Sequence, residues 1–475
     1  NGMSVLIKCF ETPNMKYVYD RSLDSVACVT NDEYKSLKEV EKTGKLPINN
    51  SLDRLIKNGF LKETVIHEIE HPETHNIKTL SEHYLNELVL QVTKQCNLRC
   101  KYCAYSGNYY NREHSSSRMR FETARKAIDF YLKRSDKFDK LSVAFYGGEP
   151  LLEFELIKKC VKYILENKGD KKVTFPMTTN GTLLTQEVIE FLVKYDFELM
   201  ISLDGNKYSH DANRQFRNGI GSFDVILSNL EKLRKYDENY YYQKVMFNCV
   251  ISSTTDLEDT YRFYSKNVLF KPEMVHFNYV NMIDIKDDNI AKLTMQNIRV
   301  DRLAYLKMLL AVLKKSAFDA QSLMMRERMS DVELLYEQLH KHSVEGEKAH
   351  HGGPCMPGIR KLFVDTDGKF YPCERVSEED PQMNIGSIQD GFDLKAMDFM
   401  INHGKMISDE CLNCWNLRRC CFCLGSIPKK NKILSKEMLL KRCKTSKAET
   451  MDCLERLCIL KEFGYKGNEN FNLYR

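Results

Sequence analysis

The sequence predicts an α/β protein whose centre is an open, partial barrel of six strand–helix units, with a small domain before it and a cysteine-rich one after it. Three observations predict this class. Apolar runs alternate with helical periodicity over residues 86–300, which indicates a parallel sheet. A separate hairpin-and-helix pattern occupies residues 3–85. After a charged helical bridge at 301–352, residues 353–475 are rich in cysteine and poor in regular periodicity.

The small N-terminal domain is predicted from turn and capping signals. Two β-rich runs, Tyr17–Asp20 and Val26–Val29, flank a short turn. Thr30 followed by Glu33 is a capping box that opens a helix, and a second helix over 52–57 ends at Asn58-Gly59. A hairpin with two or three helices fits a winged helix-turn-helix. That shape serves either DNA binding or the capture of a peptide as an added strand.

The central region supplies six predicted strands with helices between them. The strands are expected at 88–93, 141–146, 173–178, 199–203, 245–251 and 274–280. The helices are expected near 121–132, 156–164, 185–195, 223–235 and 257–267. Six units are too few for the usual eight-stranded closure, so the barrel should stay open. In such sheets the chemistry lies at the C-terminal ends of the strands.

Composition excludes several classes of function. The net charge of +5 over 475 residues is small, and no basic tract interleaved with aromatic residues suggests nucleic acid as a partner. The Lys-rich stretch from Lys429 to Arg442 is interpreted as a solvated face. No apolar run of about 18 residues predicts a membrane span, and the lack of an export signal predicts a cytoplasmic location. In that compartment 17 cysteines favour metal binding over disulfides.

The first cysteine group is a CxxxCxxC formed by Cys96, Cys100 and Cys103, directly after the first strand of the barrel. Three thiolates on one tight loop can hold three irons of a 4Fe–4S cluster and leave the fourth iron open. Zinc is the alternative. Structural zinc requires four ligands, however, and the closest further candidate is His114.

This loop, with Tyr102 before its third cysteine, resembles the signature of the radical S-adenosylmethionine (SAM) superfamily. The fold implied is a partial (β/α)6 TIM-like barrel. Further motifs of the peptide and sulfatase maturases of that superfamily follow at strand ends. They are Gly147-Gly148-Glu149-Pro150, Thr178-Thr179-Asn180-Gly181, Ser202-Leu203-Asp204-Gly205, His210-Asp211, Arg214 and Gly221-Ser222-Phe223-Asp224.

The resemblance implies roles for the predicted cofactor-binding residues. The catalytic cluster held by Cys96, Cys100 and Cys103 would cleave SAM to a 5′-deoxyadenosyl radical. Glu149 and the backbone of Gly147 and Gly148 would accept from the SAM ammonium, and the fork of Arg214 would pair with its carboxylate. The remaining predicted contacts are Tyr102, Asn180 and Ser202. For Asn180 and Ser202, ordinary turn chemistry is an equal alternative.

The second cysteine group resembles the SPASM extension of peptide-modifying relatives, which implies two auxiliary 4Fe–4S clusters and three in total. One complete ligand set would be Cys411, Cys414, Cys420 and Cys443. The other would be Cys355, Cys373 and Cys423, with an open iron unless Cys421 fills the gap. The spacing departs from the family pattern at Cys420, Cys421 and Cys423, and two zinc sites are the alternative. The remaining cysteines are interpreted as core residues: Cys9, Cys28, Cys160, Cys249, Cys453 and Cys458.

Taken together, the resemblance implies an enzyme that installs thioether crosslinks, from a Cys sulfur to carbon, in a ribosomally made Cys-rich peptide. Its N-terminal domain would recognise the leader of the precursor, and its electrons would come from a donor such as flavodoxin or ferredoxin. The thioether maturases of ranthipeptide and sactipeptide type are the group implied. The alternatives are a carbon–carbon crosslinking maturase, a sulfatase-maturase-like enzyme and an iron–sulfur DNA-binding sensor.

Overall fold

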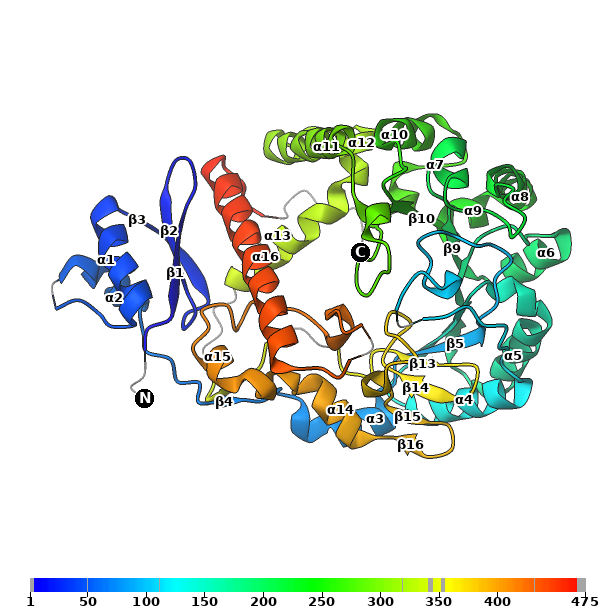
Figure 1. Ribbon diagram of the computed structural model, residues 1–475, viewed down its shortest axis with the longest axis horizontal. Helices are drawn as coiled ribbons and strands as arrows, with labels where there is room; N and C mark the ends of the chain where they lie inside the picture. The colour runs from blue at the N-terminus through cyan, green and yellow to red at the C-terminus, as the bar shows by residue number, and fades with distance from the viewer. Residues whose placement is uncertain are drawn as a thin grey trace.

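The computed structural model describes residues 4–467, with gaps at 49, 111, 318, 341–344, 352–354 and 431. The outer limits of the predicted domains at residues 3, 352, 353 and 475 lie outside the described residues. In Figure 1 a small N-terminal unit lies at one end of the molecule, and the long C-terminal helix α16 (Lys436–Glu462) runs between this unit and the rest.

The N-terminal unit is a three-stranded antiparallel sheet with helices on one side. Its strands are β1 (Ile7–Glu11), β2 (Lys16–Asp20) and β3 (Ser25–Val29), in the order β1-β2-β3. The helices are α1 (Asn31–Thr43), the short 3₁₀ helix η1 (Asn50–Leu52) and α2 (Asp53–Lys57). The predicted hairpin and the second helix lie where expected, and the Thr30–Glu33 capping box is present. Strand β1 was not predicted.

This unit has a hydrophobic core of its own, which runs from Val5 to Leu61. Phe10, Tyr17 and Tyr19 of this unit, and the chain from Ile66 onward, pack into the main core instead. The residues between the unit and the barrel form β4 (Glu68–Ile69), η2 (Thr74–Asn76) and α3 (Ile77–His83), and β4 pairs with β12 (Lys348–Ala349) far along the chain. Polar contacts attach the unit to the C-terminal region. Arg21 pairs with Glu345 at 2.9 Å, and the Tyr17 hydroxyl donates to Glu462 at 2.8 Å.

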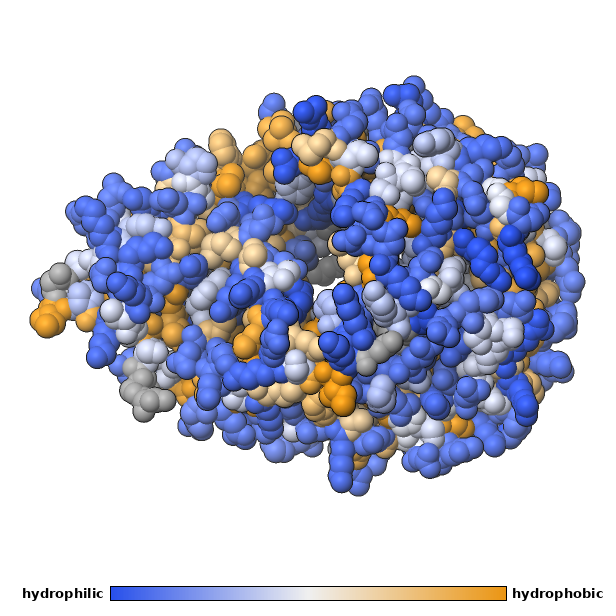
Figure 2. All heavy atoms as spheres, in the orientation of Figure 1, coloured by the Kyte–Doolittle hydropathy of each residue, from blue (hydrophilic) through white to orange (hydrophobic). Residues whose placement is uncertain are grey.

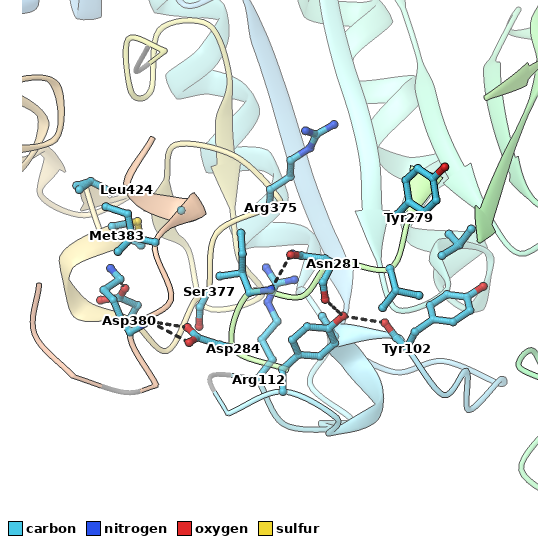
Figure 3. Close-up of a pocket in the computed structure, with 18 residues that line it drawn as sticks. Tyr102, Arg112, Tyr279, Asn281, Asp284, Arg375, Ser377, Asp380, Met383 and Leu424 are labelled. Carbon is cyan, nitrogen blue, oxygen red and sulfur yellow. Dashed lines mark hydrogen bonds and ion pairs between the residues drawn. The ribbon is translucent and has the colours of Figure 1, made fainter. Parts of the chain in front are cut away.

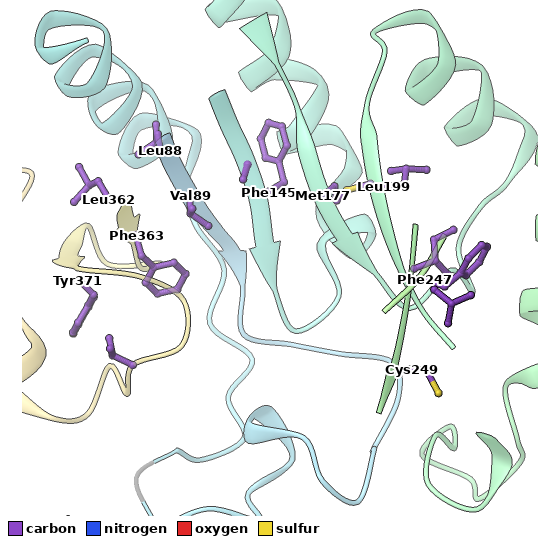
Figure 4. Packing of buried hydrophobic residues seen from close by; sticks show 14 of the residues in the cluster. Leu88, Val89, Phe145, Met177, Leu199, Phe247, Cys249, Leu362, Phe363 and Tyr371 are labelled. Carbon is purple, nitrogen blue, oxygen red and sulfur yellow. The ribbon is translucent and has the colours of Figure 1, made fainter. Parts of the chain in front are cut away.

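The central sheet contains the six predicted strands in parallel. They are β5 (Glu87–Thr93), β6 (Lys140–Gly147), β8 (Pro176–Thr179), β9 (Glu198–Ser202), β10 (Val245–Ile251) and β11 (Val275–Tyr279), with β7 (Lys172–Thr174) beside β6. Side chains on the helix-covered face of these strands form an aliphatic and aromatic core that includes Phe145, Met177, Leu199 and Phe247 (Figure 4). Because β5 and β11 are not paired with each other, the barrel is open as predicted.

Helices connect these strands and cover the outside of the sheet (Figure 1). The connecting helices are α4 (Phe121–Arg134), α5 (Phe154–Asn167), α6 (Gln186–Lys194), α7 (Lys207–Asp211), α8 (Phe223–Tyr236), α9 (Glu238–Lys244) and α10 (Leu257–Lys266). The short 3₁₀ helices are η3 (Ala104–Ser106), η4 (Pro150–Glu153), η5 (Pro272–Met274) and η6 (Asp288–Ala291). The bridge consists of α11 (Met295–Lys314), α12 (Ala320–Met324), η7 (Arg326–Met329) and α13 (Ser330–His340).

The sheet continues beyond β5 into the C-terminal region, which the sequence did not predict. Strand β13 (Leu362–Val364) pairs with β5 in parallel, and the antiparallel strands β14 (Lys369–Tyr371), β15 (Gly386–Ser387) and β16 (Gly391–Phe392) follow. These short strands lack the periodicity of longer ones, because only two or three residues pair in each. The cysteine-rich region is therefore joined to the barrel by one hydrogen-bonded sheet.

The rest of the C-terminal region is helical. It contains η8 (Pro381–Met383), α14 (Leu394–Ile401), η9 (His403–Ile407), α15 (Ser408–Leu412), η10 (Leu424–Ser426) and α16. With 27 residues, α16 corrects the expectation of little regular structure after residue 353. Two further expectations were wrong: Cys28 is exposed and not in the core, because it faces outward from β3, and Lys429 is buried beside Asp380. Among the described helices, none is both long and apolar enough to span a membrane.

Candidate active site

The first cysteine group lies on the loop between β5 and η3, at the C-terminal edge of the sheet. Backbone N–H groups point at two of its sulfurs: Leu98 N lies 3.4 Å from Cys96 Sγ, and Tyr105 N lies 3.4 Å from Cys103 Sγ. Burial raises the pKa of Cys96 to about 12 and also raises that of Cys100. These thiols therefore stay neutral at physiological pH unless a metal ionises them. Their convergence fits the three-thiolate ligand set expected from the sequence.

The loop is fixed by backbone pairing with the segment that carries Arg214. Arg99 N donates to Gln215 O at 2.8 Å, and Lys101 N donates to Asn213 O at 3.2 Å. The two segments follow different strands of the sheet, β5 and β9, and their alternating contacts hold Arg214 next to the cysteines. The guanidinium Nη1 of Arg214 lies 4.0 Å from Cys100 Sγ.

The two glycines at the end of β6 are required by the backbone near the cysteine loop. A Cβ on Gly147, whose φ is +139°, would lie 2.0 Å from Thr93 O, and one on Gly148 would lie 2.2 Å from Gln95 O. Gly148 N donates to Thr93 O at 2.9 Å instead. The sequence interpretation assigned these glycines to close approach by a ligand. The structure shows that close approach by the neighbouring strand already demands them.

Glu149 is fully buried and accepts three hydrogen bonds. Its Oε1 accepts from Leu151 N at 3.0 Å and Thr179 Oγ1 at 2.7 Å, and its Oε2 accepts from Asn180 N at 2.7 Å. Burial raises the pKa of Glu149 to about 6, although these donors oppose the shift. The Asn180 side chain in turn lies 3.7 Å from Cys96 Sγ. Glu149 and Asn180 thus form a connected polar wall on one side of the cysteine loop.

Arg214, Asp204 and Tyr102 form a second polar group beside Cys100. Nε of Arg214 lies 2.9 Å from Oδ2 of Asp204, and the guanidinium carbon lies 5.4 Å from the centre of the Tyr102 ring. The Tyr102 hydroxyl donates to the same carboxylate. The sequence named Asp204 only as part of a motif and gave it no role. Its position at the end of β9 was the available signal. Among the described residues, no hydrogen bond joins the Ser202 hydroxyl to another predicted site residue.

Four cysteines of the second group line one cavity, of about 290 Å³. They come from α15, the turn after it and α16: Cys411, Cys414, Cys420 and Cys443. Burial, and then the neighbouring thiols, raise the pKa of Cys411 to about 12. Ser446 donates to Cys420 Sγ at 3.2 Å. Four converging thiols around a cavity fit a complete four-cysteine cluster, and they are the set that the sequence grouped together.

The other cysteines of the second group lie apart from that cavity. The pKa of Cys421 is raised, first by burial and then by the neighbouring thiols of Cys355 and Cys423. The pKa of Cys373 is raised mainly by burial and also by Cys423, which is therefore its neighbour. The structure therefore divides the adjacent pair: Cys420 faces the four-cysteine cavity, whereas Cys421 lies near Cys355 and Cys423. The sequence had left the placement of Cys420, Cys421 and Cys423 open.

A cavity of about 240 Å³ lies between the first cysteine loop and the second cysteine group (Figure 3). Tyr102 and Ala104 line one side, next to Cys103. Arg375, which follows Cys373, and Leu424, which follows Cys423, line the other. Charged groups are also present in the lining, namely Arg112, Asp284, Asp380 and Lys429. The space-filling view shows a mostly hydrophilic face that is hollowed near its centre (Figure 2).

Residues 90–263 match the family model described as the Radical SAM superfamily. This part of the chain is similar to radical SAM domains. It contains the first cysteine loop, both glycines, Glu149, Asn180 and Arg214. A radical SAM domain implies SAM and one 4Fe–4S cluster as cofactors, and the three thiols and the polar groups around them fit both.

Comparison with curated proteins finds relatives among maturation enzymes. The chain is 25% identical to a cysteine-type anaerobic sulfatase-maturating enzyme of Clostridium perfringens, over 71% of this chain and 87% of that protein. It is also 25% identical to the radical SAM cyclopropyl synthase TigE of Paramaledivibacter caminithermalis, over 51% of this chain. The chain spans about half the length of TigE, 54%, and of an uncharacterised protein of Methanocaldococcus jannaschii, 50%.

Among solved structures, the sulfatase-maturating enzyme anSMEcpe with bound AdoMet shares the fold. Its TM-score is 0.56 at 22% sequence identity, and the match covers 79% of this chain and 99% of that one. The match therefore extends well beyond residues 90–263.

Proposed function

We propose that this protein is a radical SAM maturase that installs thioether crosslinks in a ribosomally synthesised, Cys-rich precursor peptide. The observation that carries the proposal is the cavity between the two cysteine groups (Figure 3). A peptide side chain in this cavity would reach the first cysteine loop from one side and the Cys373–Cys423 region from the other. The relatives support a protein or peptide substrate, because they include sulfatase-maturating enzymes and a structure described with a Cp18Cys peptide.

The proposed ligand sets follow the grouping of the thiols. Cys96, Cys100 and Cys103 would hold the SAM cluster, and the four cysteines around the second cavity would hold a complete auxiliary cluster. Cys355, Cys373 and Cys423 would hold the third, with Cys421 as the nearest additional thiol. Glu149, Asn180 and the backbone at Gly147 and Gly148 would bind the SAM amino group, and Arg214 its carboxylate. Ser202 and Tyr102 complete the proposed contacts.

The chain's own residues position the reactants. When bound, SAM and its cluster supply the radical that removes one hydrogen atom from the peptide, and an auxiliary cluster supplies an acceptor for the second electron. Tyr102, which belongs to the cysteine loop, and Tyr109 are buried and line the side of the cavity next to that loop. Arg112, held by Glu378 at 2.8 Å, lines another wall of the cavity. The electron donor, of flavodoxin or ferredoxin type, is part of the proposal.

Strand β3 is the proposed docking edge for the leader of the precursor. Arg21 N donates to Leu6 O, so the N–H groups of every second residue of β2 point toward β1. The N–H groups of the residues between them point toward β3. In the β2–β3 register their hydrogen-bonded partners are Ser25, Ala27 and Val29. The N–H groups of Val26 and Cys28 therefore face the outer edge, where an extended peptide can add a strand.

The test separates radical formation from bond formation. Cys373→Ala should keep 5′-deoxyadenosine production but stop crosslinking, because the cysteine lies outside the radical SAM domain. Cys160→Ala, which removes a buried core thiol of α5, is the matched control and should leave both intact. The wild-type product should be lighter than the precursor by two hydrogens per link, and the linked Cys should resist alkylation. Crosslinking by Cys373→Ala at the wild-type rate would contradict the proposal.

A carbon–carbon crosslinking maturase is the second candidate, favoured by the likeness to a cyclopropyl synthase. The same experiment distinguishes it. A product that has lost two hydrogens but whose Cys is still alkylated contains a carbon–carbon bond. A sulfatase-maturase-like activity would instead oxidise a single residue and leave no link between two residues of the peptide.

A further inference from the structure

Three buried histidines form a compact cluster beside the four-cysteine cavity, which His351 also lines. His350 and His351 follow β12, and His403 begins η9. Their exposed fractions are 7%, 1% and 0%. One ring nitrogen of each lies within 4.8 Å of a ring nitrogen of both others. Sequence reasoning missed this group, and the adjacent pair His350-His351 was the only local signal for it.

The hydrogen bonds of two members fix which nitrogen is available. Nδ1 of His403 lies 2.7 Å from Met400 O, and Nδ1 of His350 lies 3.0 Å from the carbonyl oxygen of His351. A carbonyl oxygen only accepts, so both Nδ1 atoms carry a proton and both Nε2 atoms carry a lone pair. The lone pair of His350 accepts from Gly404 N at 3.2 Å, so a metal bound there would replace that hydrogen bond. An imidazole that donates from one nitrogen to a backbone carbonyl is oriented as metal-binding histidines are.

Hydrogen bonding alone leaves the cluster incomplete. Nε2 of His351 lies 2.9 Å from Nε2 of His403. Because His403 has its proton on Nδ1, His351 must donate from Nε2, which leaves Nδ1 of His351 as a bare lone pair. That atom is buried and has no hydrogen-bond partner among the described residues. A buried acceptor without a donor is costly, and the metal-free cluster contains one such atom, Nδ1 of His351.

The surroundings of the cluster suit a neutral ligand set. Burial lowers the pKa of His350 to about 3 and that of His403 to about 4, so the rings stay in the unprotonated form that binds metals. Gly404 leaves room for them, since a Cβ at this position would lie 2.7 Å from His350 Nε2. Phe422 stacks on His351 with ring centres 4.7 Å apart and excludes water from that side.

We propose that His350, His351 and His403 bind one divalent transition-metal ion of the zinc class. Imidazole nitrogens are ligands that such ions prefer, at about 2.0–2.1 Å from the metal. On binding, the ion would take the place of the His351 Nε2 proton, which moves to Nδ1 of the same ring, so that the Nε2 atoms of His351 and His403 both face the ion. This site uses none of the cysteines assigned to the iron–sulfur clusters, although His351 also lines the four-cysteine cavity, and it does not depend on the peptide chemistry proposed above.

The position of the site indicates a structural role. It joins the segment after β12, which pairs with β4 near the N-terminal unit, to η9 in the C-terminal region. Asn402, next to His403, accepts a hydrogen bond from His71 N at 2.8 Å. The residues after β4 therefore also contact the start of η9. Phe422 stands between Cys421 and Cys423 in the sequence, and the ion would therefore also steady that cysteine turn.

The test uses the full-length, iron–sulfur-reconstituted protein and Zn²⁺ alone as the probe. Bound zinc is counted by mass spectrometry of the metals after gel filtration, and its ligands are identified by X-ray absorption at the zinc edge. We expect one zinc per chain with nitrogen or oxygen neighbours only. His403→Ala should weaken zinc binding at least about 10-fold without changing the iron content. His75→Ala removes an exposed histidine of η2 and is the matched control.

A second variant guards against loss of folding in His403→Ala. Gly404→Ala keeps all three imidazoles but places a methyl group against His350 Nε2, and it should also weaken zinc binding. Iron content and circular dichroism report whether each variant is folded. Sulfur neighbours around the zinc would overturn the proposal. So would wild-type zinc affinity in folded His403→Ala or folded Gly404→Ala, or an absence of tightly bound zinc in the wild type.

Discussion

Arg214 and Asp204 form a buried ion pair in which Nε lies 2.9 Å from Oδ2. The same carboxylate accepts from Val250 N at 3.0 Å, so it is fixed to β10 as well as to the guanidinium. Arg214 therefore has one edge held by Asp204 and another directed at Cys100. This arrangement orients the guanidinium before any ligand binds.

Asp204→Asn should destabilise the fold and misplace Arg214. Removing one partner of a buried ion pair leaves an uncompensated charge, which costs about 3–5 kcal/mol. The measurement is the free energy of unfolding in urea, together with the affinity for SAM. Asp224→Asn, in the exposed pair with Lys207, is the matched control and should have no measurable effect. Equal stability of the two variants would contradict the role given to Asp204.

Replacing Cys96, Cys100 and Cys103 together by Ala should abolish SAM cleavage and spare the iron of the C-terminal region. Three cubane clusters give about twelve irons per chain in the wild type and about eight in the variant. Iron analysis and deoxyadenosine chromatography after anaerobic reconstitution provide the two measurements. A wild-type value near four would mean that the C-terminal cysteines bind something else.

The raised pKa of Glu149 predicts a dependence of stability on pH. Burial raises this pKa from 4.5 to about 6. A carboxyl group whose folded-state pKa is raised stabilises the fold fully below pH 4.5, and this contribution is lost as the pH rises through about 6. Glu149→Gln does not ionise, so its stability relative to the wild type should increase across that interval, by roughly 2 kcal/mol. Urea unfolding at pH 5 and pH 8 measures the change.

Binding of SAM should show the opposite preference. The proposed contact with the SAM ammonium requires ionised Glu149, so the affinity of the wild type should fall as the pH is lowered through about 6. In Glu149→Gln this pH dependence should disappear. A wild-type affinity that is constant between pH 5 and pH 8 would remove Glu149 from the proposed SAM contacts.

Cys28→Pro should weaken binding of the precursor leader. Proline removes the outward N–H of β3 without removing a bond to β2, and an edge strand tolerates it for that reason. Cys28→Ala retains the N–H and should bind like the wild type. Fluorescence anisotropy of a labelled leader peptide gives the affinities, and deoxyadenosine formation without peptide should be equal in both. Equal leader affinity would exclude β3 as the docking edge.

The sequence predicted most of the barrel because its strands and helices are long enough to show their periods. The cysteine loop, Glu149 and Arg214 were found because they lie in motifs at strand ends. Strands β13 to β16 were missed, since two or three paired residues carry no periodic signal. Asp204 and the cluster around His403 were missed for another reason. Their partners lie far away in the chain, and only the folded structure brings them together.

The distribution of Cys420 and Cys421 shows a similar limit. Two adjacent cysteines cannot be assigned to different sites from spacing alone, because the direction of each side chain depends on the backbone of the turn. In the structure Cys420 faces the four-cysteine cavity and receives the Ser446 hydroxyl, and Cys421 faces away toward Cys355 and Cys423.

The continuity of the sheet from β5 through β13 to β14 has a kinetic consequence. The first cysteine loop leaves the end of β5, and Cys373 follows β14 by two residues. Any hinge motion between the two cysteine groups would have to break the ladder of this sheet. We therefore expect a fixed tunnelling distance between them, and an electron-transfer rate that is insensitive to solvent viscosity.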